Sequence, residues 1–196
     1  MSKLLKNSYS FLSQKTSDIL DKARLTEHTF MIIIAIIIGV IAGYLAVAIR
    51  FMIEEFSQLS FPGDGNVLEN IMSNPWYVVI LVPIIGGLIV GPLIYFFAPE
   101  AKGHGVPEVM QAILLKGGRI RPRVALIKAL ASAITIGTGG SVGREGPIIQ
   151  IGSSIGSTVG QFFKIPSKKL KTLVGCGAAA GIAAAFNAPI AGALFA

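Results

Sequence analysis

Long runs of uncharged residues constrain the fold of this chain more than any other feature. Residues 29–49 carry no charge over roughly 21 positions, enough to cross a hydrocarbon layer of about 30 Å as a helix. Residues 75–98 form a second such run, and a third begins near Val124. Only 14% of the residues are charged, whereas soluble domains carry about 25%. We therefore predict an all-α, multi-pass membrane protein.

Two later uncharged runs differ in composition from the first ones. Residues 146–163 and 173–196 are rich in glycine, serine and alanine, so we expect them to be buried against protein. Glycines recur at every fourth position from Gly152 to Gly160, a spacing that lets helices approach closely. In the third run, Lys128 lies near the start, and we expect its side chain to reach the membrane interface.

Charge patterning gives the orientation. Residues 1–27 mix lysines and an arginine with apolar residues, which predicts an amphipathic helix on the cytoplasmic membrane surface, ahead of a transmembrane domain at residues 28–196. Residues 57–74 contain no lysine or arginine, whereas residues 100–123 contain five. The positive-inside rule places the N-terminus in the cytoplasm of a cell-membrane protein. The net charge of +7 is thus a topology signal, and we expect no nucleic-acid partner because no basic patch alternates with aromatic residues.

The segment from Gly137 to Pro147 interrupts the apolar pattern. It holds five glycines and a proline between two uncharged runs, a composition incompatible with a regular helix. Irregular backbone at membrane depth is tolerated only where it is buried in protein or lines an aqueous cavity. The segment therefore indicates a transport site.

Prolines mark three expected helix starts in this chain. Pro107, Pro147 and Pro189 each precede an apolar stretch, and each is expected at the first helical position, where the missing N–H costs nothing. A helix N-terminus exposes unpaired N–H groups and the positive end of the helix dipole. Several such ends together would bind an anion weakly enough for release.

Three segments around these prolines resemble signature segments of the CLC family of chloride channels and proton-coupled chloride transporters. They are Gly-His-Gly-Val-Pro-Glu at 103–108, Gly-Arg-Glu-Gly-Pro at 143–147, and Gly-Ile-Ala-Ala-Ala-Phe-Asn-Ala-Pro at 181–189. The resemblance covers the chain from about Thr29 onward. It implies an inverted-repeat architecture with tilted, re-entrant and broken helices, transport of chloride or a similar small anion by a channel or a proton-coupled exchanger, and a homodimer.

The resemblance also implies roles for individual residues. Glu145 matches the gating glutamate, which occupies the anion site and carries the proton in exchangers; its carboxylate is costly in hydrocarbon but gains from a helix N-terminus. Arg144 either adds positive potential to the outer vestibule or holds the loop. Glu108 gains from the dipole of its helix and is expected to be structural. The expected anion-binding residues are His104, Gly105, Val106, Gly143, Arg144 and Gly146.

His104 departs from the family pattern. The matching position is often serine in chloride-selective members, where the hydroxyl helps to coordinate the ion. A neutral imidazole would donate one N–H, and a protonated one would add a positive charge. Alternatively the ring turns away and leaves coordination to backbone N–H groups. The preferred anion therefore stays open.

Two other classes of function were weighed. Gly139-Gly-Ser-Val-Gly143 matches the Gly-x-Ser-x-Gly pattern of serine hydrolases, with Ser141 as nucleophile, but only two histidines are present as bases. A cation transporter would need acidic side chains in the membrane, of which there are few; a non-transporting scaffold is the other alternative. We see no metal-binding cluster or nucleotide loop, so we expect no cofactor and no enzyme activity.

The sequence ends at Ala196 inside an apolar run. We therefore expect the chain to be part of a longer protein. By resemblance, the remainder would supply another anion-facing helix start, a coordinating tyrosine, the dimer surface and an internal glutamate.

Overall fold

A computed structural model describes the backbone of residues 2–63 and 67–195, and the side chains of residues 28–63 and 69–195. The chain divides into two compact units, residues 1–36 and residues 37–196. The first unit is the N-terminal part of helix α1 (Ser2–Ser60). Residues 2–27 are helical, but their side chains lie outside the described residues, so the amphipathic surface helix stays a prediction.

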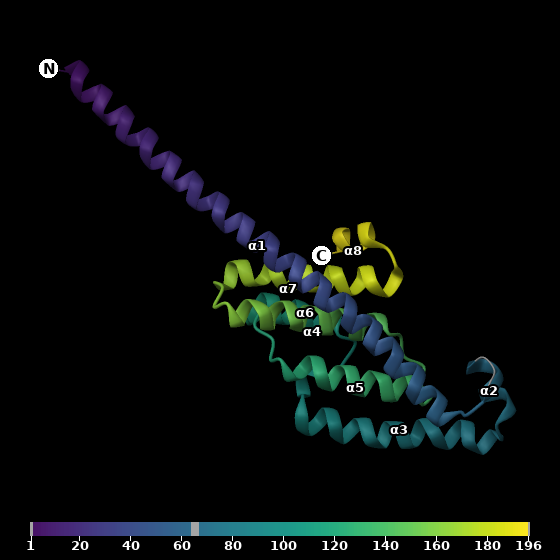
Figure 1. Ribbon diagram of the computed structural model, residues 1–196. Coiled ribbons are helices and arrows are strands. Elements are labelled where there is room, and N and C mark those ends of the chain that lie inside the picture. The colour runs from purple at the N-terminus through teal and green to yellow at the C-terminus, as the bar shows by residue number, and fades with distance from the viewer. Residues whose placement is uncertain (1, 64–66, 196) are drawn as a thin grey trace. The chain divides into compact units, whose positions relative to one another are not determined.

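All the described elements of the second unit are helices, as Figure 1 shows. After α1 come α2 (Val67–Ser73), α3 (Trp76–Phe97), the short 3-10 helix η1 (Pro99–Ala101), α4 (Val106–Leu115), α5 (Arg123–Gly137), α6 (Glu145–Phe162), α7 (Ser167–Phe186) and α8 (Pro189–Phe195). Three stretches in the described residues are long and apolar enough to cross a membrane: His28–Ser60, Trp76–Phe97 and Ser167–Phe186. The predicted all-α membrane fold is confirmed.

Helix α5 is shorter than the span expected from residue 124 onward. It has 15 residues, roughly 22 Å of helix at 1.5 Å per residue. It ends where Gly139 adopts φ +85° and Gly140 donates its N–H back to the Thr135 carbonyl. The glycine-rich break predicted from the sequence thus replaces the last turns of a full crossing.

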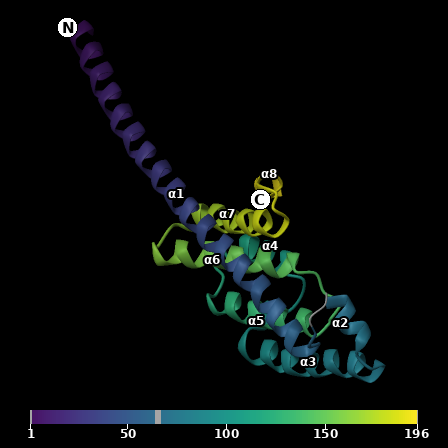
Figure 2. The same cartoon turned by 45° about the vertical axis from the view of Figure 1, so that its right-hand side comes forward.

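Helix α6 is the centre of the second unit. Every residue from Pro147 to Ser157 is buried, and α7 packs along it, as Figures 1 and 2 show. The predicted glycine stripe makes this approach possible, because a Cβ at Gly152 would collide with the Gly177 carbonyl and one at Gly156 with the Leu173 carbonyl. The expectation that the two glycine-rich runs are buried against protein is confirmed for α6, and the predicted close packing is confirmed for both helices.

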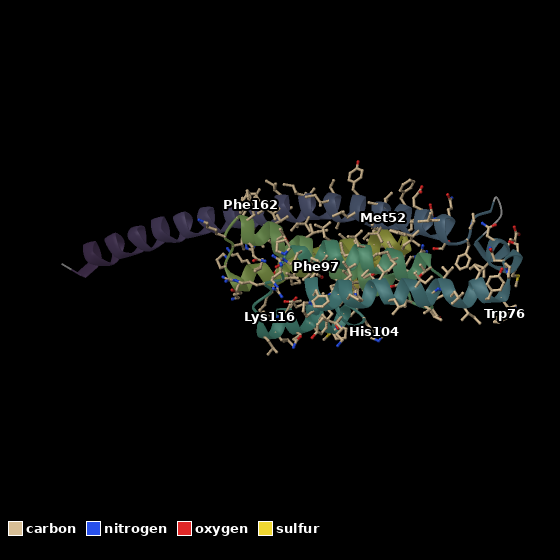
Figure 3. All side chains as sticks on the ribbon, turned by 90° about the horizontal axis from the view of Figure 1, so that it is seen from below. Met52, Trp76, Phe97, His104, Lys116 and Phe162 are labelled. Carbon is tan, nitrogen blue, oxygen red and sulfur yellow. The ribbon has the colours of Figure 1, made fainter. Side chains whose placement is uncertain are left out.

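Helix α3 lies at the edge of the unit and packs on α5. Trp76 and Phe97, its first and last residues, mark the ends of the helix in Figure 3. Large apolar side chains along α3 are exposed, among them Ile80, Ile84 and Leu88. An apolar surface of this extent suits contact with lipid or with other transmembrane helices.

The last uncharged run is broken as the sequence indicates. Helix α7 ends at Asn187, which adopts the left-handed conformation with φ 53° and ψ 37°. Helix α8 then begins at Pro189 and packs back on α7, with Gly192 beside the Ala179 carbonyl.

Candidate functional site

The starts of α4 and α6 meet through their backbones. A Cβ at Gly146 would collide with the carbonyl oxygen of His104, and a Cβ at Gly105 would collide with the carbonyl of Gly146. Gly105 also adopts φ +102°, a conformation that side chains strongly disfavour. Glycine is therefore required on both sides of the contact, which brings together two of the motifs predicted to form the anion site.

The prolines lie close to the starts of α4, α6 and α8, but two of them are not at the first helical position as predicted. Pro189 is the first residue of α8, as predicted, and Pro107 is the second residue of α4. Helix α6, however, begins at Glu145, two residues before Pro147. The first turn of a helix leaves several N–H groups without an intrahelical acceptor, so proline is accommodated beyond the first position. Glu145 is consequently itself part of the first turn.

A cavity of about 430 Å³ opens between these starts, α3 and α5. Six of the predicted site residues line it: His104, Val106, Gly143, Glu145, Gly146 and Pro147. The other lining residues come from α3, the segment after η1, α5 and the loop before α6: Val90, Ile94, Ala101, Lys102, Gly103, Lys128, Ala131, Ser132, Thr135 and Val142. Figure 3 shows His104 just ahead of α4, with Lys116 at the other end of that helix.

Backbone donors at this cavity have no partner within the described part of the chain. The N–H groups of His104, Val106 and Gly146 make no hydrogen bond there. The Gly105 N–H is different, because it donates to Glu108 Oε2 at 2.7 Å. Glu108 thus caps its own helix, in agreement with the structural role predicted for it. Unpaired N–H groups at a helix N-terminus, in turn, are a ready site for an anion.

The prediction that the Lys128 side chain reaches the membrane interface is wrong. Lys128 is 5% exposed, so its side chain is buried within the protein. Its ammonium donates instead to the carbonyl of Ala101 at 2.8 Å and to that of Gly103 at 2.7 Å. A buried ammonium must find acceptors, and these carbonyls lie within reach of α5. The wall of the cavity therefore contains an ammonium group that binds the carbonyls of Ala101 and Gly103.

Gln150 is a second functional candidate that the sequence analysis missed. It lies on α6, is 2% exposed, and donates from Nε2 to the carbonyl of Glu100 at 2.8 Å. The signal in the sequence is a lone amide in the first half of an apolar run. Polar groups in such a place are nearly always hydrogen-bonded, but the sequence does not reveal the partner.

Glu145 lines the cavity and is exposed. Its carboxylate lies over Gly143, where an added Cβ would collide with Oε2. Within the described chain the carboxylate has neither an ion pair nor a hydrogen bond. An untethered carboxylate at a helix N-terminus can occupy the anion position or leave it.

Arg144 and Pro189 lie elsewhere. Arg144 lines a separate cavity of about 90 Å³ together with Arg50, and Glu145 does not line that cavity. Pro189 is not among the residues that line the cavity around Glu145. The structure therefore does not support either residue as part of the anion site. For Arg144 the reason is that consecutive residues at a helix start point in different directions.

The rival functions gain no support from this geometry. Ser141 is exposed and does not line the cavity that contains His104, so no base lies beside it there. Among the described residues, no group of three or more histidines, cysteines or acids is placed to hold a metal ion.

A neighbouring cavity of about 600 Å³ lies on the other side of the segment that leads to α4. Glu100 in its wall forms an ion pair with Arg121. Burial raises the pKa of the Glu100 carboxyl, but the hydrogen bond from Arg121 and the charges of Arg121 and Lys116 outweigh burial and lower that pKa below its usual value. Glu100 therefore stays ionised as a structural anchor.

Comparison with known proteins decides the family. Residues 86–196 match the family model described as voltage-gated chloride channel. The chain belongs to the CLC family. The H(+)/Cl(-) exchange transporter ClcA of Cronobacter sakazakii is 38% identical over 183 residues, which cover 89% of this chain and 37% of that protein. The resemblance seen in the sequence is therefore confirmed.

Solved CLC structures share the fold of this chain. A slow cyanobacterial Cl⁻/H⁺ antiporter is 29% identical with a TM-score of 0.65, covering 83% of this chain and 38% of that one. A CLC-type fluoride/proton antiporter is 26% identical with a TM-score of 0.66, covering 85% of this chain and 39% of that one. The chain thus spans well under half the length of the CLC proteins that it matches.

Proposed function

We propose that this chain forms part of the path by which a CLC protein moves chloride or a similar small anion across a membrane. One observation carries the proposal. At the cavity of about 430 Å³, the starts of α4 and α6 present unpaired N–H groups, while Lys128 binds the nearby carbonyls. Such a site attracts an anion without a salt bridge that would hold it too tightly.

Glu145 is the proposed gate of this path. It is in the first turn of α6, lines the cavity and has no partner among the described residues. A deprotonated carboxylate there competes with the anion for the same N–H groups, and protonation removes that competition. In an exchanger, the same proton would be the one that is carried.

His104 is the proposed determinant of anion preference. It lines the cavity and is exposed, so its imidazole is free to donate an N–H to a bound ion or to turn away. The related antiporters carry chloride in one case and fluoride in another by their names. Both ions are therefore worth testing, with a homodimer and a cytoplasmic N-terminus in the cell membrane as the proposed context.

The proposal is tested by flux from liposomes that contain the purified full-length protein. We expect chloride efflux well above that of empty liposomes, and potassium efflux no higher than theirs. Proton movement coupled to chloride would identify an exchanger, and its absence a channel. Potassium efflux without chloride efflux would overturn the proposal in favour of a cation transporter.

The gating role is tested by Glu145→Gln, with Glu55→Gln as control at an exposed acid on α1. We expect Glu145→Gln to keep anion movement but to lose its pH dependence or proton coupling, because the amide cannot titrate. Glu55→Gln should behave as the parent does. An unchanged pH dependence in Glu145→Gln would contradict the gating role and leave the anion site standing.

A further inference from the structure

Gln150 binds one end of the short segment that carries His104 and lies beside the other end. Its Nε2 donates to the carbonyl of Glu100 at 2.8 Å, which is the start of the segment. At the other end, a Cβ added to Gly105 would lie 3.3 Å from Gln150 Cβ. The residue is 2% exposed, and its Oε1 has no hydrogen-bond partner among the described residues. The Glu100 carbonyl is thus the one described acceptor of this amide.

The segment from Glu100 to Gly105 is the wall between two cavities. Glu100 and Gln150 line the cavity of about 600 Å³, whereas Gly103 and His104 line the candidate anion cavity of about 430 Å³. Lys102 lines both. A shift of this wall would therefore change the shape of the anion cavity and the place of His104 in it.

The wall is held from two helices by its carbonyl groups. Lys128 of α5 binds the carbonyls of Ala101 and Gly103, and Gln150 of α6 binds that of Glu100. In a trans peptide the C=O and the following N–H point in opposite directions. Donors on the carbonyl side therefore fix the direction of the N–H groups, including that of His104.

We propose that Gln150 is a positioning residue that sets the anion preference of the site by fixing the segment that carries His104. This inference rests on the proposed function. Gln150 does not line the anion cavity, so it acts through the backbone and not by touching the ion. Without its amide the wall loses its side-chain donor from α6 at Glu100, while Lys128 of α5 still binds the carbonyls of Ala101 and Gly103. The segment can then shift away from α6, which changes the place of the His104 imidazole relative to the start of that helix.

The test is the ratio of chloride, nitrate and fluoride fluxes through the full-length protein in liposomes. Gln150→Met keeps the length of the side chain but removes the donor, and we expect it to change at least one flux ratio by roughly three- to tenfold. Gln150→His should restore the parent ratios, because the imidazole Nε2 is a donor at a similar reach.

Gln161→Met is the matched control. Gln161 lies on the same helix and donates to the carbonyl of Ile120 at 2.9 Å, in a loop that does not contain His104. Its loss is expected to leave the flux ratios at the parent values. A general loosening of α6 would instead change the ratios in both methionine variants, and that result would overturn the inference.

The remaining outcomes are also decisive. If the parent moves no anion, the proposed function fails first. If the parent is active and Gln150→Met keeps its flux ratios, the positioning role fails while the proposed function stands. If Gln150→Met does not fold, Gln150→Asn withdraws the amide by one methylene and replaces it in the test. Failure of both to fold would show a purely structural residue and would overturn the inference.

Discussion

The two loops that flank α4 are both tied to α6, but in different ways. The loop after α4 is held through donors and acceptors alike: Ser157 Oγ accepts the Ile120 N–H at 2.8 Å and donates to the Gly118 carbonyl at 2.7 Å. The side chains of α5 and α6 hold the segment before α4 through its carbonyls, at Glu100, Ala101 and Gly103, and the one N–H bound by a side chain there is that of Gly105, which donates to Glu108 of α4. The first arrangement leaves little backbone free. The second leaves N–H groups for a ligand.

This difference distinguishes the loop after α4, which we call the anchor loop, from the segment before α4, which belongs to the candidate anion site. Both loops use a glutamine of α6, namely Gln161 for the later loop and Gln150 for the earlier one. What distinguishes them is the second side chain, a neutral hydroxyl at Ser157 and a cation at Lys128. A cation bound to carbonyls adds positive potential beside the free N–H groups.

Lys128→Met should have the largest effect, because it removes the cation and leaves the carbonyls of Ala101 and Gly103 without a donor. We expect anion flux to fall by about tenfold or more, with a loss of stability of about 2 kcal/mol. Flux and thermal unfolding in detergent measure the two effects. Lys168→Met, an exposed lysine on α7, should change neither. Parent-like flux in Lys128→Met would show that the Lys128 ammonium does not contribute to anion transport.

Gly146→Ala should disrupt the contact between the two helix starts. The added methyl group collides with the His104 carbonyl, and forced overpacking costs about 1–3 kcal/mol. We expect a lower unfolding temperature and loss of anion flux. Gly87→Ala makes the same change on α3, where a Cβ meets nothing within 4 Å, and it should be neutral or slightly stabilising. Equal effects at both glycines would refute the close contact.

Ser157→Ala should weaken the anchor loop without changing the site. Removal of the hydroxyl leaves the Ile120 N–H and the Gly118 carbonyl without their partner, at a cost of about 1–3 kcal/mol. The unfolding temperature should therefore drop, while the chloride-to-nitrate flux ratio stays at the parent value. A changed flux ratio would mean that the two loops are coupled, and the contrast between anchor and site would not hold.

The smallest effect concerns the ion pair of Glu100 with Arg121. Because the pKa of the Glu100 carboxyl in the folded protein lies below its ordinary value of about 4.5, the carboxylate contributes stability above about pH 4.5, and this contribution is lost as the pH falls through the folded pKa. We expect Glu100→Gln to flatten the acid side of the stability profile, measured by thermal unfolding between pH 3 and pH 7. An identical acid profile in the variant and the parent would exclude this linkage.

The sequence predicted the backbone of the site better than its side chains. Glycine and proline act locally, so the break after α5 and the helix starts near Pro107, Pro147 and Pro189 could be located from the sequence. Side-chain direction depends on the register of packed helices. A lysine near a helix start can equally reach the interface or a buried carbonyl. The sequence predicted the interface for Lys128, whereas its ammonium binds buried carbonyls.

The same limit explains the other residues. Arg144 and Glu145 are neighbours in the sequence, but only Glu145 lines the anion cavity, because successive residues of a helix point about 100° apart. Gln150 was missed because its acceptor, the Glu100 carbonyl, is a backbone atom, and no sequence pattern identifies such a partner. Glu145, to which the family resemblance pointed, lines this cavity, and its gating role stays a prediction.

We propose that backbone N–H groups at the starts of α4 and α6 bind the anion. The most direct measurement is a crystal structure of the full-length protein soaked in bromide, with the ion located by anomalous scattering. We expect a bromide ion between these two helix starts, within hydrogen-bonding reach of the Val106 or Gly146 N–H. Chloride should displace it. Bromide bound only at surface lysines or beside Arg144, with none at the two helix starts, would contradict this proposal.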